Sequence, residues 1–232
     1  AMEVVENLYN LNKRVIFLSN APRPSHNVIN FLKKLKMKEK YLKNVITSGE
    51  AAYLSIQKKK YGLNFFHLGP QRDQSIFRGL EKNKTNLSDC DYILCTGLFD
   101  EREKDLDYYY DLLKGHEDKK FVCTNPDLTV HRGDVEEYCA GSIAEIFEKI
   151  GGKVIYFGKP HKEIYKMFIK KNEKALAIGD NLKTDIKGAN NLNIDSVFIT
   201  NGIHINEFKT EEDLASLINH YKVKTKYFQE KL

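Results

Sequence analysis

Three apolar runs of the sequence are each followed by side chains that could bind a phosphoryl group or a metal ion. The first run leads into Ser19 and Asn20, the second into Lys159, and the third into Asp180 and Asp185. In a parallel α/β sheet, ligands bind outside the carboxyl ends of the strands, where loops lead into helices. A hydroxyl and backbone N–H groups can hold a phosphate oxygen there, and an ammonium group can neutralise its charge. The three segments therefore predict an anion-binding site at one edge of a sheet.

The first two segments also have structural interpretations. Residues 19–24 (SNAPRP) are typical of an ordinary turn between a strand and a helix, because serine, asparagine and proline are common turn residues. Most lysines are solvated, and Lys159 could be one of them. Its position is unusual, however, since it lies at a strand end between Gly158, which allows a close backbone approach, and Pro160, which can start a helix.

The third segment has the composition of a magnesium site. Asp180 and Asp185 lie five residues apart, at the end of a strand and the start of a helix. Magnesium prefers hard oxygen ligands, usually one or two carboxylates with water and substrate phosphate. The structural alternative is a helix cap at Thr184, with Asp185 favoured by the helix dipole. That alternative fits Thr184 but does not explain Asp180.

The elements that must position these residues alternate along the chain. Apolar, strand-like runs are separated by amphipathic helical patterns, which predicts an α/β fold with a parallel sheet covered on both faces. A capping pattern, Thr210 followed by Asp213, opens one of these helices. Residues 61–151 are more polar and less regular, and we interpret them as a second, smaller α/β domain inserted into the first. The strand-like runs are residues 14–19, 64–68, 92–96, 120–124, 153–157, 175–178 and 196–200.

Composition narrows the function classes. The chain has 232 residues and a formal net charge of +5, with no apolar run near the roughly 20 residues that span a bilayer and no signal-peptide pattern. We expect neither a membrane nor a nucleic acid as partner, because basic residues form no dense stripe and no aromatic ribonucleoprotein motif is present. A mild positive charge suits a small anionic substrate. The four cysteines lack metal-site spacing and indicate buried thiols in the cytoplasm.

The motifs together resemble those of the haloacid dehalogenase superfamily, in the branch of nitrophenylphosphatase-like sugar phosphatases. The resemblance rests on the serine motif at residues 19–24, on GKP at 158–160, and on GDNLKTDI at 179–186. It extends from Arg14 almost to His204 and includes TNPD at 124–127, which is similar to a segment near the end of that branch's cap domain. It implies a Rossmann-like parallel-sheet core with an inserted α/β cap. We accordingly expect core residues 1–61 and 152–232, and a cap over residues 62–151.

The resemblance also implies a function. It predicts a magnesium-dependent phosphomonoesterase that acts on a small phosphorylated metabolite, such as a sugar phosphate or nucleotide, through an aspartyl-phosphate intermediate. Position for position, Ser19 and Lys159 would hold the phosphoryl oxygens, Asp180 would bind Mg²⁺, and Asp185 would support the metal site. The branch is compatible with a homodimer formed through the cap.

Four further residues are candidates for substrate binding. Asn125 and Asp127 would lie near the junction of cap and core, where they could contact the leaving group, although Asn-Pro-Asp is also typical of a plain β-turn. Asn20 and Arg23 belong to the serine motif and could bind an anionic substrate, although an arginine near a turn is usually solvated.

One expected part of the family pattern is missing. In that family the nucleophilic aspartate ends the central strand of the sheet, one loop-and-helix unit before the serine motif's strand. Here residues 2–12 have the pattern of a helix that leads directly into the strand ending at Ser19. We therefore expect the nucleophile and its strand upstream of Ala1, and an inactive chain without them. The alternatives are a non-catalytic phosphoryl-binding protein that has lost the nucleophile and a receiver-type signalling domain, which the long insertion between Ser19 and Lys159 disfavours.

Overall fold

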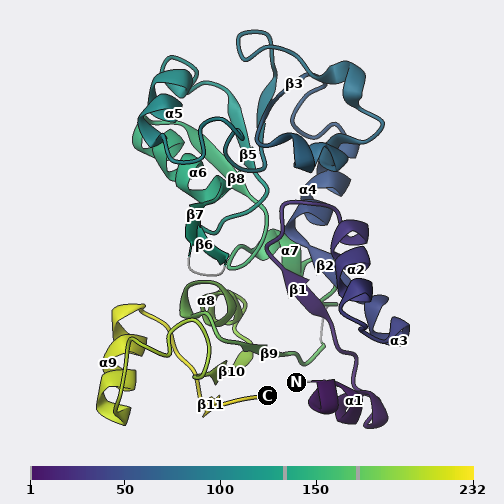
Figure 1. Ribbon diagram of the computed structural model, residues 1–232, viewed down its shortest axis with the longest axis vertical. Helices are drawn as coiled ribbons and strands as arrows, with labels where there is room; N and C mark the ends of the chain where they lie inside the picture. The colour runs from purple at the N-terminus through teal and green to yellow at the C-terminus, as the bar shows by residue number, and fades with distance from the viewer. Residues whose placement is uncertain (1, 133–134, 171–172) are drawn as a thin grey trace. The chain divides into compact units, whose positions relative to one another are not determined.

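The computed structural model describes residues 2–132, 135–170 and 173–232, and its chain divides into two compact units (Figure 1). One unit is residues 16–158, and the other combines the first fifteen residues with residues 159–232. Both are built from parallel strands and helices, which confirms the α/β class. None of the described helices combines the length and the hydropathy that crossing a membrane requires.

The unit of residues 16–158 begins with a parallel strand pair, β1 (Phe17–Ser19) and β2 (Val45–Thr47). Thr47 ends β2 and caps the next helix, α4 (Ser48–Gln57), because its side-chain oxygen accepts the backbone N–H of Glu50 at 2.9 Å. Between the two strands lie α2 (Ser25–Lys34) and α3 (Glu39–Leu42). Pro24 precedes α2, and no side chain caps this helix.

A four-stranded parallel sheet also belongs to this unit. Its order is β3 (Phe65–Leu68), β4 (Tyr92–Cys95), β5 (Lys120–Cys123) and β8 (Lys153–Tyr156). All four strands confirm apolar runs that the sequence predicts as strands. The run that becomes β8 was expected in the second core segment, but it pairs with β5 in the sheet of the middle region. The division into core and cap itself stays a prediction.

The core of this sheet is aromatic and aliphatic. Helices α5 (Leu106–Leu113) and α6 (Ala140–Lys149) pack together against it (Figure 1). Phe121 of β5 and Phe147 of α6 are fully buried, and their rings stack with centroids 4.8 Å apart. All four cysteines of the chain are buried thiols in this unit, as the sequence predicts: Cys90, Cys95, Cys123 and Cys139.

Besides β2, two further parts of this unit were not predicted from the sequence. Strands β6 (Thr129–Arg132) and β7 (Val135–Tyr138) form an antiparallel pair just before α6. After β3, the chain forms two 3₁₀ helices, η1 (Gln71–Phe77) and η2 (Glu81–Asn83). Both η1 and the strand pair contribute to the cavity described below.

The second unit holds a three-stranded parallel sheet in the order β11 (Tyr227–Gln229), β10 (Asp195–Ile199) and β9 (Leu176–Gly179). After β9 comes a short π-helix, η3 (Leu182–Ile186), which continues into α8 (Lys187–Asn191). Leu182 and Ile186 of η3 are fully buried and pack with Phe198 of β10. The core packing therefore anchors the loop that follows β9.

Three further helices complete the unit. Helix α9 (Glu211–His220) carries the expected capping box, in which Thr210 and Asp213 exchange hydrogen bonds with each other's backbone. Helix α1 (Met2–Asn10) confirms the helix expected near the start of the chain, and α7 (Lys162–Tyr165) follows Lys159.

Candidate functional site

Two groups of predicted site residues lie in the two units, and each is described within its own unit. In the unit of residues 159–232, Lys159 and Asp185 form an ion pair, with Nζ 2.7 Å from Oδ1. Both side chains are largely buried, at 17% and 12% exposed. The second oxygen of Asp185 accepts the backbone N–H of Asn181 at 3.2 Å. Buried charges are retained where they are paired in this way, and the pair fixes the ammonium group in place.

Asp180 directly follows β9, and the backbone holds its carboxylate. Its Oδ2 accepts the N–H of Ile203 at 3.1 Å. A Cβ added to Gly202 would lie 2.4 Å from that Oδ2, and one added to Gly179 would lie 2.4 Å from Oδ2 of Asp185. Glycine at these two positions therefore lets both carboxylates lie directly against the backbone.

The loop after β9 is capped by a different residue from the one expected. Asn181 precedes η3, and its Oδ1 accepts the N–H of Lys183 at 2.8 Å. Thr184 is buried inside η3, so the helix-cap explanation of Thr184 is wrong. An asparagine cap one residue after Asp180 orients the loop that separates the two carboxylates.

His204 supports the same loop and was assigned no role from the sequence. Its side chain is 4% exposed, and its Nε2 accepts the N–H of Leu182 at 3.1 Å. Because Nε2 accepts, Nδ1 carries the proton and donates to Glu207 at 2.5 Å, and Glu207 also accepts from the hydroxyl of Tyr221. Burial raises the pKa of Glu207, but these hydrogen bonds and nearby positive charge, including that of Lys183, together outweigh burial and lower it overall. The available signal was the position of His204 after the carboxyl end of β10, which runs parallel to β9.

In the unit of residues 16–158, the structure brings together predicted residues from β1 and β5. Nδ2 of Asn20 donates to Oδ1 of Asp127 at 2.9 Å, and Oδ1 of Asn125 accepts the N–H of Asp127 at 3.1 Å. Ser19 ends β1, and its hydroxyl accepts the N–H of Ala21 at 3.2 Å. The side chain of Asn125 thus holds the backbone of Asp127, whose own side chain contacts the serine motif.

Two residues fix this junction. Ser48, at the start of α4, contacts the carbonyl oxygen of Thr124 and donates to that of Phe157 at 2.5 Å. Gly158 has a φ of +112°, and a Cβ there would lie 2.7 Å from Oδ1 of Asn20. The predicted close backbone approach at Gly158 is therefore confirmed, and side chains larger than hydrogen are excluded there.

A cavity of about 320 Å³ lies among these residues. This volume is at the lower end of small-molecule pockets, which suits a small metabolite. The loops that follow β1, β3, β4 and β5 and the pair β6–β7 contribute its walls. Its lining includes five residues predicted from the sequence, Ser19, Asn20, Arg23, Asn125 and Asp127, and further charged residues that were not predicted, among them Arg72, Asp73, Glu103 and Glu137.

A buried histidine lies behind the cavity wall. His67 of β3 shares a hydrogen bond of 3.0 Å with the hydroxyl of Thr96, which lines the cavity. Burial, with a smaller contribution from the charge of Lys84, lowers the pKa of His67 to about 4. His67 is therefore neutral near pH 7, and we assign it a structural rather than a proton-transfer role.

One family model matches the part of the chain that holds the predicted metal-binding residues. The model of the HAD-hydrolase-like family matches residues 156–223, which contain Lys159, Asp180, Asp185 and His204. Ribonucleotide monophosphatase NagD of Escherichia coli K12 is 32% identical over 89 residues, which are 36% of this chain. The match spans only about a third of the relative's length, 34%.

Solved structures extend the similarity along the whole chain. A haloacid dehalogenase-like hydrolase from Brucella suis 1330 matches with a TM-score of 0.84 and 27% identity, over 100% of this chain and 88% of that one. A 4-nitrophenylphosphatase from Thermotoga maritima matches with a TM-score of 0.74 and 25% identity, over 99% of this chain and 86% of that one. A p-nitrophenyl phosphatase from Archaeoglobus fulgidus, 19% identical with a TM-score of 0.77, shares the fold. The matched segment is thus similar to the HAD-hydrolase-like family, and the fold of the whole chain is similar to that of solved haloacid dehalogenase-like hydrolases.

Proposed function

We propose that the protein is a magnesium-dependent phosphomonoesterase that acts on a small phosphorylated metabolite through an aspartyl-phosphate intermediate. The observation that carries the proposal is the cluster of Lys159, Asp180 and Asp185 beside the end of β9, inside the segment that matches the hydrolase family. A buried ammonium group and two carboxylates held by backbone N–H groups are suited to binding a phosphoryl group together with a metal ion.

The donor set fits Mg²⁺. Asp180 offers Oδ1, to which no described residue donates, while its Oδ2 is held by Ile203. Asp185 is committed to Lys159 and to the N–H of Asn181, so we assign it a supporting role, through water or through Lys159. No group of three or more histidine, cysteine or acidic side chains that could hold a metal occurs in the described ranges. This composition suits an ion that keeps water and substrate oxygens as ligands, as Mg²⁺ does. Bound there, Mg²⁺ would stabilise the negative charge of the phosphoryl group.

The remaining side chains bind and orient the substrate in this proposal. The ammonium group of Lys159 and the hydroxyl of Ser19 hold phosphoryl oxygens. They thereby position the phosphoryl group and stabilise its negative charge. Asn20, Asn125, Asp127 and Arg23, which line the cavity in the unit of residues 16–158, are the proposed contacts of the leaving group. We further propose a cytoplasmic enzyme whose partner is the metabolite rather than a nucleic acid or a membrane. Sedimentation velocity tests the expected homodimer.

Hydrolysis by the intact protein tests the function. We expect turnover of p-nitrophenyl phosphate and of selected sugar phosphates or nucleoside monophosphates that requires Mg²⁺ and is lost with a chelator. Acid quenching during turnover, followed by peptide mass mapping, should identify a phosphorylated aspartate. The alternative, a phosphoryl-binding protein without a nucleophile, predicts Mg²⁺-dependent phosphate binding with no turnover and no phosphorylated peptide.

A further inference from the structure

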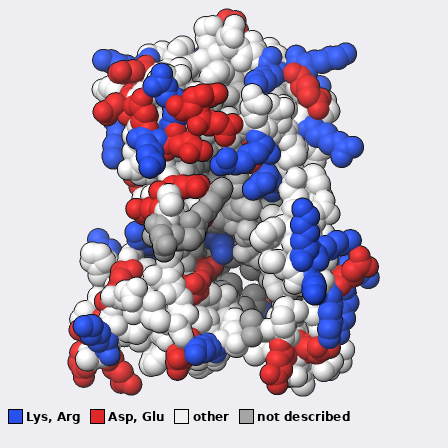
Figure 2. Space-filling view, viewed as in Figure 1, with Lys and Arg blue, Asp and Glu red and all other residues white. Residues whose placement is uncertain are grey.

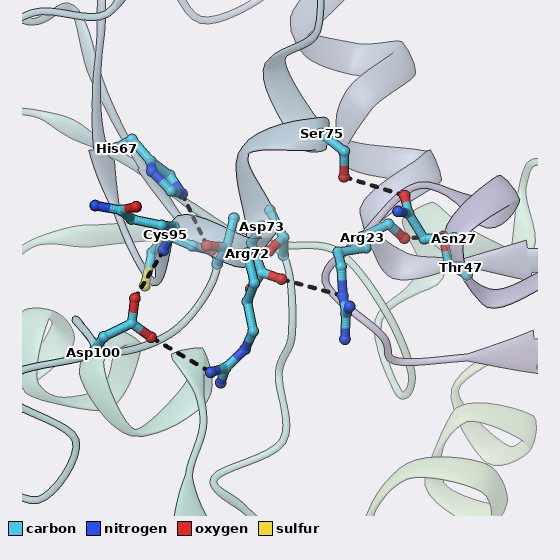
Figure 3. Close-up of polar contacts among 12 residues, drawn as sticks. Arg23, Asn27, Thr47, His67, Arg72, Asp73, Ser75, Cys95 and Asp100 are labelled. Carbon is cyan, nitrogen blue, oxygen red and sulfur yellow. Dashed lines mark hydrogen bonds and ion pairs between the residues drawn. The ribbon is translucent and has the colours of Figure 1, made fainter. Parts of the chain in front are cut away.

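Arg23 is held in the cavity wall by a buried carboxylate (Figure 3). Its Nε lies 3.2 Å from Oδ1 of Asp73, whose side chain is 4% exposed, while the Arg23 side chain is 38% exposed. The backbone is fixed as well, since the hydroxyl of Thr47 donates to the carbonyl oxygen of Arg23 at 2.7 Å. Both ends of Arg23 are therefore anchored, and its guanidinium is oriented before any ligand arrives.

Asp73 belongs to η1, which is itself tied to its surroundings on both sides. At its start, the N–H of Gln71 donates to Asp100 at 3.1 Å. Further along, the hydroxyl of Ser75 donates to the side chain of Asn27 in α2 at 3.1 Å (Figure 3). The carboxylate that orients Arg23 is thus part of a fixed element rather than a mobile loop tip.

The contact with Asp73 uses only one edge of the guanidinium. Asp73 is bound through Nε, and among the described residues no acceptor engages the Nη groups of Arg23. Arg23, Asp73, Ser19 and Asp127 line the same cavity. The Nη groups can therefore donate two parallel hydrogen bonds to a planar or tetrahedral anion, the geometry in which arginine is most effective.

We propose that Arg23, positioned by Asp73, binds a second anionic group of the substrate. This inference rests on the proposed phosphomonoesterase and specifies its substrate class: a metabolite that carries a carboxylate or a second phosphate besides the phosphoryl group that is removed. Asp127, Glu103 and Glu137 line the same cavity and can accept hydrogen bonds from substrate hydroxyl groups. The cavity is therefore suited to the part of a small, hydroxylated substrate that carries this second anionic group.

Substrate preference tests the inference. The intact protein is assayed with p-nitrophenyl phosphate and ribose 5-phosphate, which have no second anion, and with 3-phosphoglycerate and fructose 1,6-bisphosphate, which carry a carboxylate and a second phosphate. We expect Arg23→Gln to lower kcat/KM about 10- to 100-fold for the doubly anionic pair, mainly through KM, and less than about 3-fold for the others. Equal losses for all four substrates would mean that Arg23 contacts the transferred phosphoryl group, and no loss would mean that it binds nothing. Either result overturns the inference.

Two further variants separate positioning from folding. Asp73→Asn should raise KM for the doubly anionic substrates alone, and Arg23→Lys, which keeps the charge but loses the Nε contact and the paired donors, should recover only part of the preference. Arg102→Gln is the matched control, since Arg102 pairs with Asp105 at 3.3 Å outside the cavity lining. If Asp73→Asn lowers Tm so far that the protein unfolds, Arg23→Lys still tests the inference. A substrate preference fully retained with lysine would contradict a role for the orientation of the arginine.

Binding without turnover distinguishes failure of this inference from failure of the proposed function. Calorimetry with phosphonoacetate, which has a carboxylate, and methylphosphonate, which lacks one, needs no hydrolysis. We expect phosphonoacetate to bind at least about tenfold more tightly to the unmodified protein, and Arg23→Gln to remove the difference. Equal affinities would overturn the inference even in an active enzyme. A preserved difference in a protein without turnover would support the subsite and reject the phosphomonoesterase.

Discussion

One oxygen of the Asp180 carboxylate is held by the backbone, and the other is the oxygen that we propose as a ligand of Mg²⁺. The N–H of Ile203 holds one oxygen, and the other is directed to no described donor. Replacement by asparagine keeps the shape and removes the charge. We expect Asp180→Asn to weaken Mg²⁺ binding by at least about tenfold, measured by calorimetric titration of the intact protein. Asp195→Asn, which alters an exposed aspartate paired with Lys226, is the control. Equal Mg²⁺ affinity in both variants would show that Asp180 is not a ligand.

The role proposed for Lys159 has a catalytic part and a structural part, and the two can be measured separately. Lys159→Met should lower kcat by about 10²- to 10³-fold, because a fixed cation that stabilises transition-state charge contributes that much in a shielded site. It also leaves Asp185, only 12% exposed, without its cation, so Tm should fall. The control is Lys166→Met, since Lys166 pairs with Glu163 at the surface. Near-normal turnover of Lys159→Met would contradict the assignment.

At the scale of elements, the loop from β9 into η3 depends on a neighbouring segment for its shape. His204 accepts the N–H of Leu182, and its own proton goes to Glu207. We expect His204→Ala to leave that N–H without its partner, to reduce the free energy of unfolding by about 1–3 kcal/mol, and to weaken Mg²⁺ binding at the same time. Denaturant unfolding and calorimetry measure the two effects. His220→Ala, in the exposed last turn of α9, is the control and should change neither quantity. An unaltered Mg²⁺ affinity in His204→Ala would show that His204 stabilises the core without affecting the metal site.

Burial and strand length decide which elements could be predicted from the sequence. Strands buried on both faces, such as β4, are continuous apolar runs, and their positions were predicted to within a few residues. Strand β7 was missed because its residues Val135–Tyr138 are mostly exposed and carry no apolar signal, and β2 was missed because it has only three residues. Short or exposed strands depend on pairing partners, which periodicity does not describe.

The residues of the candidate site also differ in whether the sequence could predict them. Lys159, Asp180 and Asp185 could be proposed from the sequence because each belongs to a local motif that follows a strand, and the structure pairs Lys159 with Asp185. Asp73 lay outside every motif, since its role comes from contact with Arg23, fifty residues earlier. Contacts between distant segments depend on the fold, and no local sequence pattern predicts them.

For the whole molecule, buried histidine makes stability depend on pH. The pKa of His67 falls from 6.5 to about 4 on folding, so the unfolded chain binds this proton more readily than the native protein. The free energy of unfolding should therefore fall as pH decreases from about 6.5 to about 4, by up to about 3 kcal/mol from this residue. Urea unfolding at pH 7 and pH 4.5 measures the change. In His67→Gln the dependence should be reduced, whereas in His26→Gln, which alters an exposed histidine, it should persist. A His67→Gln protein with an unchanged pH dependence would contradict this account.

Charge is also unevenly distributed over the molecule. Figure 2 shows lysine and arginine side chains gathered over α2 and α3, on the face viewed there. The sequence contributes a run of lysines to this surface, interrupted by one acidic residue, Glu39, which pairs with Lys33 at 2.8 Å. A positive surface on the unit that contains the cavity raises the local concentration of anionic metabolites, an effect that added salt should weaken.

The reactivity of the buried thiols can report on opening of the unit of residues 16–158. All four lie in the unit of residues 16–158, and burial raises the pKa values of Cys90, Cys95 and Cys123, so a thiol reagent reacts with them only when that unit opens. Cys139 differs, because it also lines the cavity. A molecule that fills the cavity should therefore slow alkylation of Cys139 more than that of Cys90. The ratio of the two alkylation rates, read by peptide mass spectrometry, would report cavity occupancy in the unmodified protein.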